Sequence, residues 1–183
     1  AGVRRSAVGA VEWSPGGVRG GPSCVACAHA SSAAHDGGRA VRLDESAARA
    51  RLVAHDHAVL ATMHAERGID TVPVVYAVDG DYVGVPIDLV KPKASVQLQR
   101  EANLTADPRA SLMAQCWDRD DWTRLWWVRV ELRWQGLGHP HEAALAALLA
   151  QRYVQYADQP FSHVLVFRID GISGWAATGD ERE

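Results

Sequence analysis

The sequence predicts a mainly β protein, a small barrel of about six antiparallel strands with helices at its periphery. From residue 57 onward, short segments rich in β-branched and aromatic residues alternate with turn residues. Asp79-Gly80-Asp81 lies between two such segments and is typical of a hairpin turn. Nothing in the sequence resembles the strand, phosphate-binding glycine loop and helix of a parallel nucleotide-binding sheet.

The expected elements follow one another as a meander. Asp44 can cap a helix over residues 44–55. Two more helices are expected at 95–105, which Asp107-Pro108 ends, and at 141–156, where apolar residues recur at helical spacing. The strands are expected at residues 57–64, 71–78, 82–87, 109–117, 123–135 and 162–169.

The chain divides into two parts. Glycine, alanine, serine and proline dominate residues 1–40 without any periodicity, so we expect a flexible N-terminal extension outside the fold. Residues 41–183 carry the regular patterns and are numerous enough for one domain with a sizeable core.

Composition argues against several classes of function. A formal net charge of −3 gives no sign of binding to nucleic acid or to a membrane. No apolar run approaches the roughly 20 residues of a membrane-spanning helix, and the N-terminus lacks a secretory signal, so we expect a cytoplasmic protein. Cys24-x-x-Cys27 lacks a second ligand pair, and His55, His57 and His64 lack metal spacing on any one element. We therefore expect no metal site.

The turn Lys91-Pro92-Lys93 is the most informative local motif. Pro92 favours an extended Lys91, and residues two apart in an extended segment point the same way, so both ammonium groups can reach one anion. Ser95 can cap the helix that follows, and the first backbone N–H groups of that helix add positive potential. The turn is either a phosphate site or a pair of solvated surface lysines, and local sequence does not separate the two.

Tryptophans are concentrated in one strand–loop–strand region. Because Trp126 and Trp127 are adjacent, a strand would direct them to opposite faces. One can pack inside the barrel while the other reaches a subunit interface or a ring-shaped ligand; packing alone is the other explanation. The region contains Trp117, Trp122, Trp126, Trp127 and Trp134.

Together these motifs resemble the pyridoxamine-phosphate-oxidase-like split β-barrels, and within them the actinobacterial deazaflavin-dependent oxidoreductases. The resemblance covers residues 41 to 177. It rests on the strand at His57–Met63, the hairpin segment 71–81, Lys91-Pro92-Lys93, Asn103-Leu104, Asp107-Pro108-Arg109, the segment 122–129 with Arg124-Leu125-Trp126-Trp127, and Ser173-Gly174-Trp175.

The resemblance implies a homodimer of six-stranded split barrels, with a cofactor in each cleft between subunits. It places the cofactor ring against Pro73, Val74 and Val75 and the phosphate at Lys91 and Lys93. Trp127, Arg129 and Trp175 are its candidates for closing over the ring from the other subunit. The implied chemistry is hydride transfer between the deazaflavin coenzyme F-420 and an unsaturated small-molecule substrate; no catalytic side chain is identified. An FMN-dependent oxidase and a non-catalytic protein for a flavin-like ligand, haem or another planar ligand are the alternatives.

The chain departs from the family pattern after the lysines. Relatives usually carry arginine and then serine or threonine there, followed by further basic residues. Here Ala94 and Ser95 follow, with Arg100 farther along the helix. Losing one charge-assisted contact costs roughly 1.5–3 kcal/mol, or about a tenfold to hundredfold in affinity. Binding through Lys91, Lys93, Ser95 and Arg100 is therefore expected to be weaker, differently arranged or lost.

Overall fold

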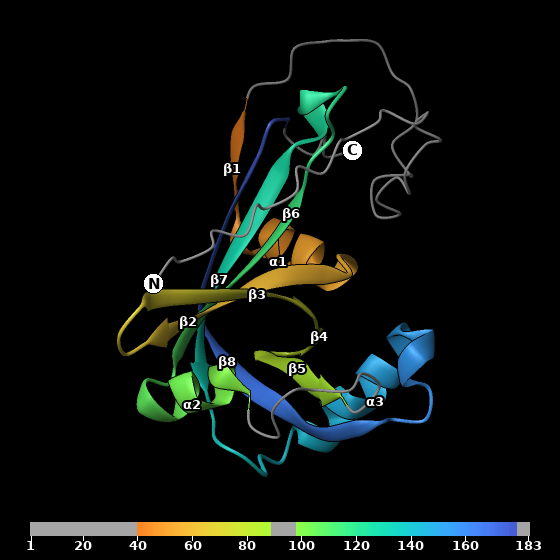
Figure 1. Cartoon of the computed structure of the whole chain (residues 1–183). Helices are drawn as coiled ribbons and strands as arrows, with labels where there is room; N and C mark the ends of the chain where they lie inside the picture. The colour runs from red at the N-terminus through yellow and green to blue at the C-terminus, as the bar shows by residue number, and fades with distance from the viewer. Residues whose placement is uncertain (1–39, 89–97, 179–183) are drawn as a thin grey trace, which may run out of the picture.

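The computed structural model describes residues 40–88 and 98–178 (Figure 1). Three α-helices occur among these residues: α1 (Glu45–Ala54), α2 (Gln99–Ala106) and α3 (Glu142–Arg152), with 3-10 helices at Trp122–Arg124 and Val154–Tyr156. The strands are β1 (Val41–Leu43), β2 (His57–His64), β3 (Gly68–Val75), β4 (Ala77–Asp79), β5 (Tyr82–Asp88), β6 (Arg109–Cys116), β7 (Trp126–Trp134) and β8 (Phe161–Ala176).

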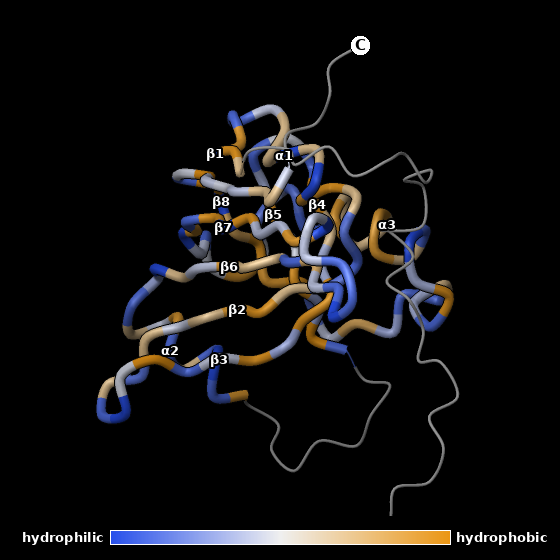
Figure 2. Tube along the Cα trace, turned by 90° about the horizontal axis from the view of Figure 1, so that it is seen from above, coloured by the Kyte–Doolittle hydropathy of each residue, from blue (hydrophilic) through white to orange (hydrophobic). Residues whose placement is uncertain are grey.

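All eight of these strands belong to one antiparallel sheet. Its order is β3-β2-β6-β7-β8-β5-β4, and β1 pairs with the C-terminal end of β8. Strands β3 and β4 stand at opposite ends of this order, yet only Tyr76 separates them in the chain. The sheet must therefore curl until its two ends meet, which makes a barrel. Because β4 covers only the first part of β5, the seam of the barrel lies between β3 and β5. Figure 2 shows the order from β8 to β3 from above, with α2 and α3 on opposite sides.

The inward face of the sheet is apolar because its strands alternate. In β7, Trp126, Val128, Val130 and Leu132 are buried, while the residues between them face outward. Leu60 and Leu112, paired across β2 and β6, are also fully buried, as are Leu165 and Phe167 of β8. The prediction of a mainly antiparallel β protein with peripheral helices is confirmed.

The sequence encodes the start of α1 and the close packing of α3 on the barrel. Asp44 caps α1 by accepting a hydrogen bond of 2.8 Å from the Ala47 N–H, as the sequence predicted. Helix α3 packs closely on β5 at Gly84, where an added Cβ would lie 2.8 Å from the Cβ of Leu145. Only glycine fits such an approach without displacing the helix.

The expected number of six strands was too low. The segment predicted as one strand at 71–78 divides at Tyr76 into β3 and β4, because the chain turns there from one end of the sheet to the other. Strand β1 adds three residues, and β8 continues to Ala176 because it also pairs with β7 and β1. The first residues of the segment predicted as one strand at 123–135 instead belong to the 3-10 helix Trp122–Arg124, which Asp121 caps. Strand β7 begins at Trp126.

Several predictions concern residues that the structure does not describe. Lys91, Lys93 and Ser95 lie outside the described residues, as does nearly all of the expected N-terminal extension. The predicted capping role of Ser95 is nevertheless wrong for α2: this helix begins at Gln99 and has Leu98 at its N-cap. None of the helices in residues 40–88 and 98–178 is long and apolar enough to cross a membrane.

Candidate functional site

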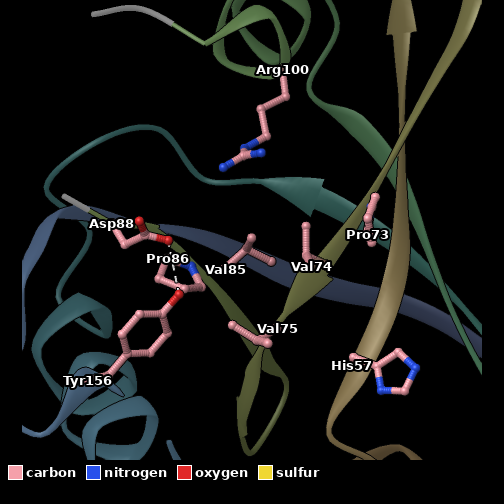
Figure 3. Close-up of a pocket in the computed structure, with 9 residues that line it drawn as sticks. All are labelled: His57, Pro73, Val74, Val75, Val85, Pro86, Asp88, Arg100 and Tyr156. Carbon is pink, nitrogen blue, oxygen red and sulfur yellow. Dashed lines mark hydrogen bonds between the residues drawn. The ribbon is translucent and has the colours of Figure 1, made fainter. Parts of the chain in front are cut away.

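A pocket of about 270 Å³ lies between β3 and β5, at the seam of the barrel (Figure 3). We call it the β3–β5 pocket. Strand β4 pairs only with residues 82–84 of β5, so the rest of that edge of β5 has no strand beside it. The pocket forms at this unpaired edge. Its walls are made by His57, Pro73, Val74, Val75, Val85, Pro86, Asp88, Arg100 and Tyr156.

Pro86 fits this position because proline has no N–H to donate. It pairs with Val164 of β8 on one side and faces the pocket on the other. Proline is atypical inside a strand that is paired on both sides, and the structure supplies the reason for Pro86: β5 is an edge strand there. Together with Val74, Val75 and Val85, it forms an apolar wall for a flat ligand.

Tyr76 holds the end of β3 in place beside the pocket. Its buried hydroxyl donates a hydrogen bond of 2.6 Å to the carbonyl of Leu52, in α1. Its own carbonyl accepts a hydrogen bond of 3.1 Å from the hydroxyl of Tyr153, just beyond α3. Burial raises the pKa of Tyr76 well above that of an exposed tyrosine, so the hydroxyl stays protonated and can keep donating.

Arg100 supplies the positive charge of the pocket. Its side chain extends from α2 toward Asp88 and the valine wall (Figure 3). The guanidinium makes no hydrogen bond or ion pair with any described residue, and its Nε atom is buried. Burial lowers the pKa of Arg100, while nearby Glu101 and Asp88 oppose that shift. Arg100 as a whole is partly buried, and a partly buried guanidinium without a hydrogen-bond partner favours an anionic ligand at this position.

Tyr156 and Asp88 form the polar end of the pocket. The Tyr156 hydroxyl donates a hydrogen bond of 3.0 Å to Asp88 Oδ2 (Figure 3). Burial and the Asp88 carboxylate raise the pKa of Tyr156 to about 12. At neutral pH the phenol is therefore a hydrogen-bond donor, and the pair can orient a polar edge of a ligand.

Two histidines lie at the β2 side of the pocket. His57 lines the pocket, and the ring of His55 lies 4.8 Å from it, centroid to centroid. His55 is buried and packs edge-on against Trp126, and neither of its ring nitrogens has a hydrogen-bond partner among the described residues. Burial lowers the pKa of His55, and His57 and Arg152 act in the same direction while Asp56 opposes them. His55 is therefore held as a neutral ring behind His57.

The structure brings together four of the ten predicted cofactor-binding residues: Pro73, Val74, Val75 and Arg100. Trp127, Arg129 and Trp175 do not line the pocket. They lie on β7 and β8, where Trp127 is paired with Trp175. The sequence reasoning missed His57, Val85, Asp88 and Tyr156, because only the curled sheet brings β2, β5 and the end of α3 beside β3.

A second cavity, of about 420 Å³, lies between α3 and the start of β8. His139, Glu142, Phe161 and His163 are among its lining residues. Within residues 40–88 and 98–178 no group of three or more histidine, cysteine, aspartate or glutamate side chains is arranged to bind a metal ion. Cys24 and Cys27 lie outside that part of the chain.

Known structures share this fold. No family model and no curated protein matches the chain. A FAD-binding protein from Mesorhizobium loti aligns with a TM-score of 0.57 and 16% identity, over 74% of this chain and 96% of that one. A proposed 5-nitroimidazole resistance protein from Bacteroides thetaiotaomicron aligns with a TM-score of 0.58 and 9% identity, over 80% and 95%.

A haem-binding protein from Mycobacterium smegmatis aligns with a TM-score of 0.56 and 18% identity, over 77% of this chain and 57% of that one. At these identities the similarity concerns the fold and not the ligand. The curled antiparallel sheet, its seam at β3 and β5 and these similarities agree with the sequence-based expectation. The chain folds as a split β-barrel of the pyridoxamine-phosphate-oxidase-like type.

Proposed function

We propose that the β3–β5 pocket binds a flavin-type cofactor and that the protein is an oxidoreductase. One observation carries the proposal: the Arg100 guanidinium, without a partner among the described residues, faces a pocket whose main wall is valine and proline. A flavin has the matching parts, a flat ring system for the apolar wall and a phosphate for the cation. Lys91 and Lys93 would add charge to the phosphate site, as the sequence motif predicts.

The deazaflavin coenzyme F-420 is the first candidate and FMN the second. The resemblance of the sequence motifs supports the deazaflavin. A fold shared with an FAD-binding protein supports flavins in general. When bound, such a ring supplies two-electron hydride transfer to an unsaturated small molecule. The side chains of this protein orient the ring, hold its phosphate and present the Tyr156 and Asp88 pair to its polar edge.

A non-catalytic role in binding a planar ligand is the competing proposal. Ala94 stands where relatives usually carry an arginine, and a protein of the same fold is described as haem-binding. The two proposals differ in a measurable property. An oxidoreductase must bind a redox-active flavin or deazaflavin, whereas a haem carrier or another binding protein need not.

We also propose a homodimer that completes the pocket. A row of paired residues runs from the pocket across the outward face of the sheet: Pro73 opposite Val59, Val59 opposite Met113, and Met113 opposite Arg129. Val59 and Met113 are exposed apolar side chains on this face. A second copy covering the face would bury them and bring Trp127, Arg129 and Trp175 of one protomer toward the pocket of its partner.

The size of the pocket supports the same arrangement. Small-molecule sites usually enclose roughly 300–1,000 Å³. The β3–β5 pocket of one protomer, at about 270 Å³, is slightly smaller than this and is open on one side. A wall from a second copy would enclose a ligand that one protomer holds only in part.

A fluorescence titration tests the proposed function. The purified protein is titrated separately with oxidised coenzyme F-420, FMN and haem. Micromolar binding of the deazaflavin but not of FMN supports the first candidate, and the reverse supports the second. Binding of haem alone supports the non-catalytic role. If neither flavin nor deazaflavin binds, the oxidoreductase proposal is wrong.

A further inference from the structure

Helix α2, which carries Arg100, is attached to the barrel on one side by a polar contact outside the pocket. His163 Nε2, on β8, lies 3.1 Å from Oε1 of Glu101, the residue after Arg100. The approach does not meet the geometry of a hydrogen bond, so the two side chains make a close polar contact. Both side chains are mostly buried, with 21% and 16% exposed, and the pair is therefore only weakly screened by solvent.

The other oxygen of Glu101 fixes the first turn of the same helix. Glu101 Oε2 accepts a hydrogen bond of 3.1 Å from the N–H of Leu98, the N-cap residue. One carboxylate thus joins β8 to the beginning of α2. Because consecutive helical residues point about 100° apart, Glu101 can face β8 while Arg100 faces the pocket.

The C-terminal half of α2 is attached to the opposite side of the seam. Buried Asn103 donates hydrogen bonds of 3.0 Å to Thr62 of β2 and to Asp70 of β3, and accepts one from Gln99. The helix is therefore held between β8 on one side and β2 with β3 on the other. Arg100 lies on the same helix, one residue before Glu101 and three residues before Asn103.

We infer that His163, through Glu101, positions the Arg100 guanidinium for binding the anionic group of the cofactor. Arg100 makes no hydrogen bond or ion pair with a described residue, so the helix sets where its charge lies. His163 lines the second cavity and not the β3–β5 pocket. The inference rests on the proposed function, because it assigns Arg100 to an anionic group of a flavin-type cofactor.

FMN is compared with riboflavin or, if only the deazaflavin binds, coenzyme F-420 is compared in the same way with its phosphate-free deazariboflavin. Riboflavin lacks the phosphate and therefore does not use the anion site. His163→Leu is expected to weaken FMN binding by roughly fivefold to tenfold, less than loss of Arg100 itself, with riboflavin affinity unchanged. His163→Gln keeps an N–H group toward Glu101 and should restore most of the FMN affinity. His139→Leu, in the same second cavity, is the matched control and should leave FMN affinity unchanged.

A double-mutant cycle provides the second measurement. In an Arg100→Gln background, His163→Leu should change FMN affinity by less than about twofold, because the group it positions is absent. Equal losses of FMN and riboflavin affinity in His163→Leu would indicate a general structural defect and overturn the inference. Unchanged FMN affinity in His163→Leu would also overturn it.

An NMR experiment on the cofactor-free protein separates failure of the inference from failure of the proposed function. The Arg100 Nε–H signal is identified by its loss in Arg100→Gln. It should shift in His163→Leu, return toward its original position in His163→Gln and stay unchanged in His139→Leu. If the wild-type protein binds neither FMN nor the deazaflavin, the proposed function fails, and this signal still tests positioning. An unshifted signal in His163→Leu would disprove positioning even in a protein that binds FMN.

Discussion

The hydroxyl of Tyr156 donates a hydrogen bond to the carboxylate of Asp88 across 3.0 Å, and this pair forms one end of the β3–β5 pocket. Tyr156 follows α3, and Asp88 ends β5. The bond therefore joins the end of the α3 region to the unpaired edge of the sheet, next to the place where a flavin-type ring is proposed to lie.

The titration of Tyr156 is the first prediction. Its pKa is raised to about 12 by burial and by Asp88. Because an unfolded tyrosine ionises near pH 10, the contribution of Tyr156 to stability is complete below about pH 10 and is lost as pH rises toward 12. Burial also raises the pKa of Tyr76 and of Tyr153, so Tyr156→Phe should remove the share of one tyrosine from the phenolate absorbance that appears near pH 12. A variant that keeps the full amplitude of this absorbance change would contradict the assignment.

The second prediction concerns the charge of the pocket. Arg100→Gln should weaken binding of FMN or the deazaflavin by about a tenfold to hundredfold, because a charge-assisted contact with the phosphate is lost. Fluorescence titration measures the change. Arg119→Gln is the control, since Arg119 is 87% exposed and lies outside the pocket. Equal affinities for Arg100→Gln and wild type would rule out Arg100 as the anion-binding residue.

The lysine turn is tested separately. Lys91→Ala and Lys93→Ala should each weaken binding of the phosphate-bearing cofactor by about tenfold or more. Affinity for riboflavin should stay unchanged, because it has no phosphate. If FMN affinity is also unchanged in both variants, the turn is a pair of surface lysines, the alternative that the local sequence left open.

The fourth prediction is a loss of stability in Tyr76→Phe. The Leu52 carbonyl would lose the donor that it has at 2.6 Å in the core, which should lower the free energy of unfolding by about 1–3 kcal/mol. Denaturant unfolding measures this. Tyr82→Phe is the control, because the Tyr82 hydroxyl makes no hydrogen bond with a described residue. A Tyr76→Phe protein as stable as wild type would show that the hydroxyl does not fix the junction of β3 and β4.

The fifth prediction concerns His55 and acid. Burial lowers the pKa of His55 in the folded state. Its stabilising contribution is therefore present above the pKa of an unfolded histidine, about 6.5, and is lost as pH falls below it. His55→Phe removes the titrating ring and should flatten this part of the stability curve. An equally steep fall in His55→Phe would exclude His55 as the cause.

The last prediction tests the proposed homodimer. Met113→Glu places a charge in the middle of the outward face of β2, β6 and β7, and should shift a dimer to monomers in light scattering. Val154→Glu is the control, because Val154 is 88% exposed and lies beyond α3, away from that face. A wild-type protein that is monomeric at all accessible concentrations would contradict the proposal.

Local sequence determined the elements whose formation depends on neighbouring residues. The turn at Gly80 has the positive φ, 56°, that a hairpin needs, and Asp44 caps α1 as its position predicts. The alternation around Val128 and Val130 determined which face of β7 is buried. These features follow from local backbone geometry and side-chain periodicity, so the chain specifies them without knowledge of distant partners.

Tertiary structure decided everything that depends on pairing between distant residues. Tyr76 lies inside what reads as one strand, but its hydroxyl bonds to Leu52 and the chain crosses there between the two ends of the sheet. The edge at Pro86 and the arrival of Tyr156 beside Asp88 likewise follow only from closure of the barrel. Hydrophobic patterning determines which face of a segment is buried, but it does not determine which distant strand will cover that face.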